Sequence, residues 1–210
     1  TINHSLFKSL LFFGAGNIYS QMHTTHLDRF GGVAKHMPVT AILFLVATVA
    51  ICALPPLNGF VGEFMIYLGM LNSVRDGVNT LYAAGGLLAL ALIGGIVVLA
   101  FTKLYSTVFL GSPRHHHVAE SEEVDSLRIA AMAIPAAGII AIGLFPQYAI
   151  RIIEPVVESL TGTNVAYIDG YISPNLSRIS LTAILLIIVI ALLYIVKRRA
   201  QSTRTVAKGP

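Results

Sequence analysis

Four titratable side chains stand inside or beside long uncharged stretches, and they are the residues of this sequence most able to do chemistry. They are His4, Lys8, Glu63 and Lys103. Imidazole, amine and carboxyl groups each take up and release a proton, and an ionised group in an apolar environment is costly unless it has a partner or a task. The chemistry that this set suggests is proton exchange along a path through an apolar protein.

Glu63 follows an interruption in one of these stretches. Residues 36–62 carry no formal charge, and Pro55, Pro56 and Gly59 fall inside them. Adjacent prolines remove backbone donors and clash with the preceding turn, so a helix is predicted to stop there and to restart just after Gly59. Inside a membrane such a break is tolerated only where protein or a water-filled cavity satisfies the freed backbone groups. The sequence therefore predicts a broken helix that carries a buried carboxylate.

Each of these residues also has a plainer interpretation. Glu63, with Tyr67 one turn on as a supporting hydrogen-bond partner, is either a proton-carrying group or a static acid that plugs the break. His4 and Lys8 are four apart and share a helix face, which suits a relay, but near a helix start both can instead extend to the membrane surface. For Lys103 the roles of relay and interfacial anchor stay equally open.

Two histidine clusters raise the question of a metal site, and neither supports one. The loop with His23 and His26, and the run His115–His117, each lack a second, regularly spaced group of ligands. We therefore predict no metal ligands and no cofactor. Cys52 is the single cysteine, which excludes a disulfide within this chain and iron–sulfur ligation by it.

The composition predicts an all-α polytopic membrane protein. The sequence is 55% hydrophobic and 11% charged, with a mean hydropathy of +0.77. Its net charge of +4 does not indicate nucleic-acid binding, because the basic residues fall in loops and in the tail. About 20 apolar residues of helix cross a bilayer. We predict about five transmembrane helices, with the second one broken, over Ser9–Leu27, His36–Gly62, Gly77–Thr102, Ile129–Ile150 and Ile179–Val196.

Charge placement orients these spans. The basic tail after Val196 predicts a cytoplasmic C-terminus, because positive loops stay on the inner side. Counting back, residues 28–36 and 112–127 are predicted to face the cytoplasm, and residues 72–80 and 154–178 to face outward. The range 154–178 is rich in turn formers and tyrosines, so we expect a loop at the headgroup level. Because the sequence opens directly in an apolar helix, we expect it to be the C-terminal piece of a longer protein.

Four segments of the sequence resemble a known family. They are His4–Gly16 (HxxxK…LLFxGxG), Asp28–Pro38 (DRxGG…MP), Ala53–Phe64 (ALPPLNGFVGEF) and Phe101–Arg114 (FxK…FLGxPR). They are similar to the proton-conducting antiporter-like subunits of NADH–quinone oxidoreductases, membrane-bound hydrogenases and Mrp antiporters. The sequence around the double proline most resembles the hydrogenase-4 and formate hydrogenlyase branch.

The resemblance implies an architecture and a set of roles. Members have two inverted five-helix repeats, each with a proton half-channel. Residues 1–111 would be the last three helices of the second repeat, and residues 112–210 two further helices. His4 and Lys8 would lie on a central polar axis, and Glu63 would be the exit-side group. The first repeat is absent from this sequence.

The expected function is a proton-translocating subunit of a hydrogenase- or NADH-dehydrogenase-like complex, with redox chemistry in partner subunits. The expected location is a bacterial or archaeal plasma membrane, and the expected partners are membrane and peripheral subunits. The moved ion is a proton, with Na+ left open. Two alternatives remain: an Mrp-type cation/proton antiporter subunit, and a structural membrane scaffold whose buried charges merely pair.

Overall fold

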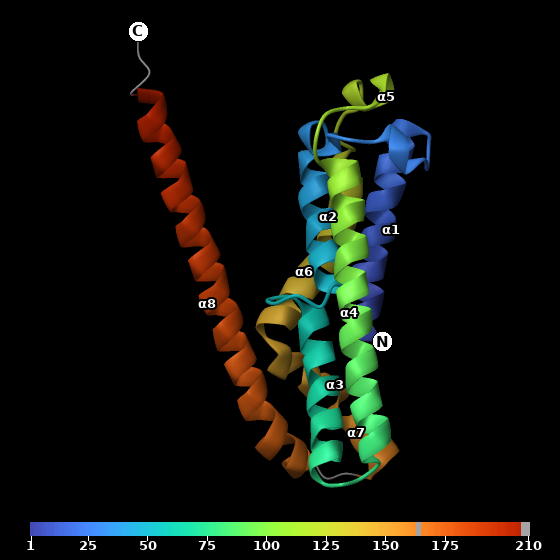
Figure 1. The fold of residues 1–210 in the computed structure, drawn as a ribbon, viewed down its shortest axis with the longest axis vertical. Helices are drawn as coiled ribbons and strands as arrows, with labels where there is room; N and C mark the ends of the chain where they lie inside the picture. The colour runs from blue at the N-terminus through green and yellow to red at the C-terminus, as the bar shows by residue number, and fades with distance from the viewer. Residues whose placement is uncertain (163–164, 207–210) are drawn as a thin grey trace. The chain divides into compact units, whose positions relative to one another are not determined.

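The computed structural model describes residues 1–162 and 165–206, and every regular element among them is helical (Figure 1). The side chains of residues 116–117, 163–173 and 200–210 are not among those described. The elements are α1 (Ile2–Met22), η1 (Leu27–Arg29), η2 (Val33–Lys35), α2 (Pro38–Ile51), α3 (Asn58–Arg75), α4 (Thr80–Phe109), α5 (His116–Ala119), α6 (Ser126–Leu144), α7 (Pro146–Thr161) and α8 (Val165–Val206). The predicted all-α class is confirmed. The chain forms two compact units, Thr1–Gly143 and Leu144–Pro210.

The core of the first unit lies where α1, α2 and α6 meet. Leu10, Ala47 and Met132, one from each of these helices, are fully buried. Gly14 permits close packing, because a side-chain carbon there would lie 2.5 Å from the ring of Phe44. Small residues let apolar helices approach closely, which is how membrane helices gain dispersion contacts without a hydrophobic driving force.

The predicted broken helix sets the layout of this unit. α1 packs mainly along α2, and α3 packs mainly along α4. In Figure 1 α1 runs from the level of the break to one end of the unit, α3 runs from the same level to the opposite end, and α4 passes both. The two halves of the broken helix therefore have different main neighbours.

Glycines join the two loops at one end of the unit. The amide of Gly32 donates a hydrogen bond to the carbonyl of Leu110 over 2.8 Å. Gly31 and Gly32 have φ values of +130° and +70°, which a side chain would strain, and they lie against the backbone of residues 111–113. The loops over 28–36 and 112–127 therefore share one end, as their common predicted side requires.

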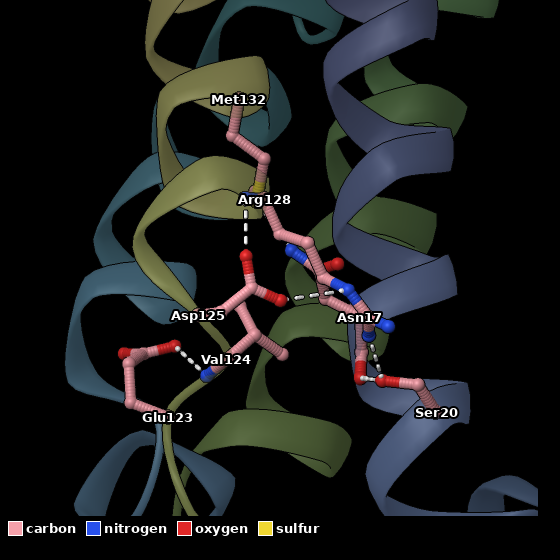
Figure 2. A network of polar contacts seen from close by, with 7 residues as sticks. All are labelled: Asn17, Ser20, Glu123, Val124, Asp125, Arg128 and Met132. Atoms are coloured by element: carbon pink, nitrogen blue, oxygen red, sulfur yellow. Dashed lines mark hydrogen bonds and ion pairs between the residues drawn. The ribbon is translucent and has the colours of Figure 1, made fainter.

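A polar clasp over Glu123–Arg128 ties three helices together near that end (Figure 2). The Glu123 carboxylate accepts hydrogen bonds from the amides of Val39 (2.7 Å) and Thr40 (3.2 Å) and from the Thr40 hydroxyl (2.6 Å). A carboxylate at a helix N-terminus satisfies free donors and complements the helix dipole. Glu123 therefore fixes the start of α2, although it lies far along the chain.

The other arm of the clasp reaches α1. The Arg128 guanidinium pairs with Asp125 at 3.1 Å and donates to the Ser20 hydroxyl at 2.8 Å. Asp125 also accepts the Arg128 amide at 3.0 Å, so it caps α6. The buried Asn17 amide contacts the Met132 sulfur at 3.1 Å. Figure 2 shows these groups bridging α1 and α6.

The apolar helices match the predicted spans in part. In the described part of the chain, three helices are long and apolar enough to cross a membrane, at Thr80–Phe109, Ser126–Leu144 and Pro174–Arg199, and Pro38–Ile51 is a shorter apolar helix. α1 and α3 are not among them, although they have 21 and 18 residues. Both contain the polar residues singled out above, which lower their hydropathy. The count of five spans remains a prediction.

The predicted outer loop over 154–178 is wrong, because most of that range is helical. α6 ends at Leu144, and the strongly amphipathic α7 begins at Pro146. The residue before a proline disfavours helix, and proline suits a first helical position. Pro146 therefore sets the boundary between α6 and α7 by its local backbone preference. Pro155 and Pro174, which suggested turns, lie inside α7 and α8. The tyrosines expected at the headgroup level, Tyr167 and Tyr171, lie outside the described side chains.

Candidate functional site

The break between α2 and α3 is a compact turn closed by backbone contacts. The amides of Ala53 and Leu54 donate to the carbonyls of Ala50 (3.1 Å) and Val49 (3.2 Å), so turns satisfy the end of α2. A side-chain carbon on Gly59 would overlap the Ala50 carbonyl oxygen. This close approach explains why glycine follows the two prolines.

α6 covers the other side of the break. A side-chain carbon on Gly143 would overlap the Pro56 carbonyl oxygen and crowd Leu57. Pro55 is exposed and Pro56 half-buried. Protein therefore encloses much of the opened turn, as a break at membrane depth requires.

Glu63 lies in a pocket between α3 and α4. The pocket has a volume of about 310 Å³, and its lining includes Glu63, Tyr67, Ala53, Gly94 and Gly95. The half-buried Glu63 carboxylate and the Tyr67 phenol interact, as the i, i+4 spacing predicts. The missing side chain at Gly94 leaves room beside the Glu63 Oε1 atom, because a carbon there would lie 3.4 Å from it. The pocket can hold water next to a carboxyl group.

His4 and Lys8 lie on the first half of α1. Lys8 is half-buried, and His4 is exposed with its ring set edge-on to Phe7 at a centroid distance of 5.2 Å. In the described part of the chain, no ion pair joins Lys8 to Glu63. The structure therefore places the two predicted relay groups on one connected unit without direct contact.

Two asparagines that the sequence analysis did not single out join the helices that carry these groups. The Asn3 Nδ2 donates to the main-chain carbonyl of Asn58 over 2.9 Å, and the Asn58 Nδ2 donates to the Asn3 Oδ1 over 3.3 Å. Asn58 is fully buried at the first position of α3. The signal that could have found them is an amide beside a helix break and another beside His4, in otherwise apolar surroundings.

Lys103 is exposed on the last third of α4, six residues before that helix ends at Phe109. The Ser106 hydroxyl donates to the Lys103 carbonyl over 3.0 Å rather than to its amine. α4 begins three residues after the start of the predicted span Gly77–Thr102 and continues seven residues beyond its end. The choice between relay and anchor at Lys103 stays a prediction.

Among the described residues, no three His, Cys, Asp or Glu side chains form a group that could hold a metal ion. The side chains of His116 and His117 lie outside those described. His23, Arg29 and His115 line a shallow pocket of about 130 Å³ near the joined loops.

Comparisons with known proteins agree with this architecture. Residues 1–107 match the transmembrane family described as NADH:quinone oxidoreductase/Mrp antiporter. Hydrogenase-4 component B of Escherichia coli (strain K12) is 35% identical, over 97% of this chain and 32% of that protein. Formate hydrogenlyase subunit 3 of the same organism is 44% identical, over 54% of this chain and 19% of that protein.

A solved structure shares the fold. The Mrp complex from Dietzia sp. DQ12-45-1b contains a chain that matches with a TM-score of 0.58 and 20% identity, over 70% of this chain and 34% of that one. The present chain spans a third or less of the curated relatives named above. The family match covers residues 1–107, which include the broken helix and the polar stretch of α1. The chain therefore belongs to the NADH:quinone oxidoreductase/Mrp antiporter transmembrane family.

Proposed function

We propose that this chain is part of a proton-translocating membrane subunit of a hydrogenase- or NADH-dehydrogenase-like complex. Partner subunits would carry out the redox chemistry, and this chain would move the proton. The similarity to hydrogenase-4 component B over 97% of this chain supports this assignment.

The observation that carries the proposal is the Glu63 pocket. A carboxylate follows a double-proline break, faces about 310 Å³ of space and interacts with Tyr67. Burying an acid beside an opened helix is costly, and such costs are found at ion pathways in membrane proteins. Glu63 would take up and release the proton, and Lys8 and His4 would serve the path from the other side of the break.

The finer parts of the proposal concern surroundings and orientation. We propose that the parent protein lies in a bacterial or archaeal plasma membrane, with the joined loops over 28–36 and 112–127 and the basic C-terminal tail in the cytoplasm. Peripheral subunits would supply the redox energy. The moved ion would be the proton, because Glu63, Lys8 and His4 are proton-exchanging groups.

The test replaces Glu63 by Gln in the full-length parent within its complex. Gln keeps the size and the hydrogen bonding but cannot ionise, so proton uptake by proteoliposomes should fall at least tenfold while assembly is unchanged. The matched control is Glu120→Gln, which neutralises an exposed loop acid. Wild-type uptake in an assembled Glu63→Gln complex would show that Glu63 has only the structural role of filling the helix break.

A further inference from the structure

The two ends of the proposed proton path lie too far apart for direct transfer. Lys8 is five residues beyond Asn3, and Glu63 is five residues beyond Asn58. At 1.5 Å per residue, each lies about 7.5 Å along its helix from the asparagine pair. α1 and α3 leave the level of the break in opposite directions (Figure 1), so the axial separation is about 15 Å. A proton needs intermediate carriers over that distance.

The asparagine pair is a fixed polar point between those ends. Two hydrogen bonds hold Asn3 to Asn58: the Asn3 Nδ2 donates to the main-chain carbonyl of Asn58 over 2.9 Å, and the Asn58 Nδ2 donates to the Asn3 Oδ1 over 3.3 Å. Gly62 makes room for this contact, because a side-chain carbon there would lie 3.1 Å from the Asn3 Nδ2. The pair joins the helix that carries Lys8 to the helix that carries Glu63.

One oxygen atom of the pair has unused hydrogen-bonding capacity. The Asn58 Oδ1 is buried and accepts no hydrogen bond from any described residue. Reversing the amide would not help, because it would set the Asn58 oxygen against the Asn3 Oδ1, which now accepts from the Asn58 Nδ2. Buried amide oxygens are nearly always satisfied, either by protein or by an ordered water molecule.

We propose that the Asn58 Oδ1 binds a water molecule that is a fixed link in a water chain between Lys8 and Glu63. Asn3 is a positioning residue that holds the Asn58 amide in the required orientation. The water donates one hydrogen to the Asn58 Oδ1 and keeps its other hydrogen and its lone pairs for neighbours in the chain. Neither asparagine exchanges protons itself. The inference rests on the proposed function, since it concerns how Glu63 is reached.

The first measurement is structural and independent of activity. A cryo-electron microscopy map of the parent complex, at a resolution that shows ordered water, should contain a density peak about 2.8 Å from the Asn58 Oδ1. A map in which an apolar side chain fills this position, or a protein donor reaches the Oδ1, would overturn the proposal.

The second measurement is proton uptake by proteoliposomes that carry the intact complex. Asn58→Leu removes the acceptor and should slow uptake at least tenfold. Asn58→Asp keeps an acceptor oxygen but loses the donor to Asn3, so uptake should be several-fold faster than in Asn58→Leu, with an altered pH profile. Equal impairment of both variants would show that Asn58 only supports the structure.

Thr48 supplies the matched control. Its hydroxyl oxygen is also buried without a partner among the described residues, but Thr48 lies on α2 and not on either helix of the pair. Thr48→Val should leave uptake unchanged. If Asn58→Leu fails to assemble, the density map tests the proposal by itself. Wild-type uptake in an assembled Asn58→Leu complex would overturn this inference alone, whereas an inactive wild-type complex would overturn the proposed function.

Discussion

At the scale of single residues, position in the structure separates groups that look equivalent in the sequence. Glu63 lies in a pocket with a hydroxyl neighbour, Lys8 is half-buried, and Lys103 is exposed. The free-energy cost of an ion in an apolar medium depends on how far it lies from water, so the ionised forms of these three groups differ in cost. Glu63 and Lys8 are the stronger candidates for proton exchange.

Lys8 gives the first prediction at this scale. Lys8→Ala should impair transport, and Lys8→Arg should be poorly tolerated, because a guanidinium does not release its proton at accessible pH. The measurement is proton uptake by proteoliposomes with the intact complex. Wild-type rates in Lys8→Arg would exclude proton exchange at this position and leave a fixed positive charge.

Coupling between Lys8 and Glu63 gives the second prediction at this scale. If both belong to one path, the double variant Lys8→Ala with Glu63→Gln should lose little more than either single variant, since groups that act as a unit lose most of their function at the first deletion. Uptake rates of the four complexes measure this. Losses that multiply would place the two residues on separate paths.

At the scale of elements, the broken helix depends on one glycine. Gly59→Ala would press a carbon into the Ala50 carbonyl and force α2 and α3 apart. Overpacking of this kind costs about 2 kcal/mol, so the thermal unfolding temperature of the purified parent should fall. The control is Gly69→Ala on the same helix, where an added carbon meets no atom within 4 Å and helix propensity improves. Equal stability of the two variants would contradict the close contact.

The clasp makes a separate prediction for α2. Glu123→Ala removes the acceptor of the Val39 and Thr40 amides and should destabilise the protein by about 2 kcal/mol, with Gln costing less because it keeps an acceptor. Hydrogen exchange at those two amides should quicken in Glu123→Ala. Exposed Glu120→Ala should leave it unchanged. Unchanged exchange in Glu123→Ala would show that another group caps α2.

The elements also show what the sequence could and could not predict. The break at Pro55 and Pro56 was predictable, because adjacent prolines act locally. The run over 154–178 was misread, since prolines inside α7 and α8 look like turn formers when packing is unknown. The Asn3–Asn58 pair and the Glu123 cap join residues far apart in sequence, and no local pattern predicts such partners.

At the scale of the whole molecule, the structure supports a constraint on topology. The loops over 28–36 and 112–127 share one end of the first unit, joined from Gly32 to Leu110, and α3 carries the chain from the break to the loop over 72–80. Figure 1 shows that loop at the opposite end of the unit. Any orientation in the membrane must therefore put the first two loops on one side and the third on the other.

Cysteine labelling of the full-length parent tests this constraint and the predicted orientation together. In a Cys52→Ala background, with any cysteines outside this chain also replaced, Asp76→Cys should react with a membrane-impermeant maleimide in intact cells. Lys35→Cys and Ser112→Cys should react only after permeabilisation, because their loops are predicted to be cytoplasmic. All three native residues are exposed, so access to solvent is comparable. The reverse pattern would invert the orientation and keep the fold, whereas opposite behaviour of Lys35→Cys and Ser112→Cys would contradict the joined loops.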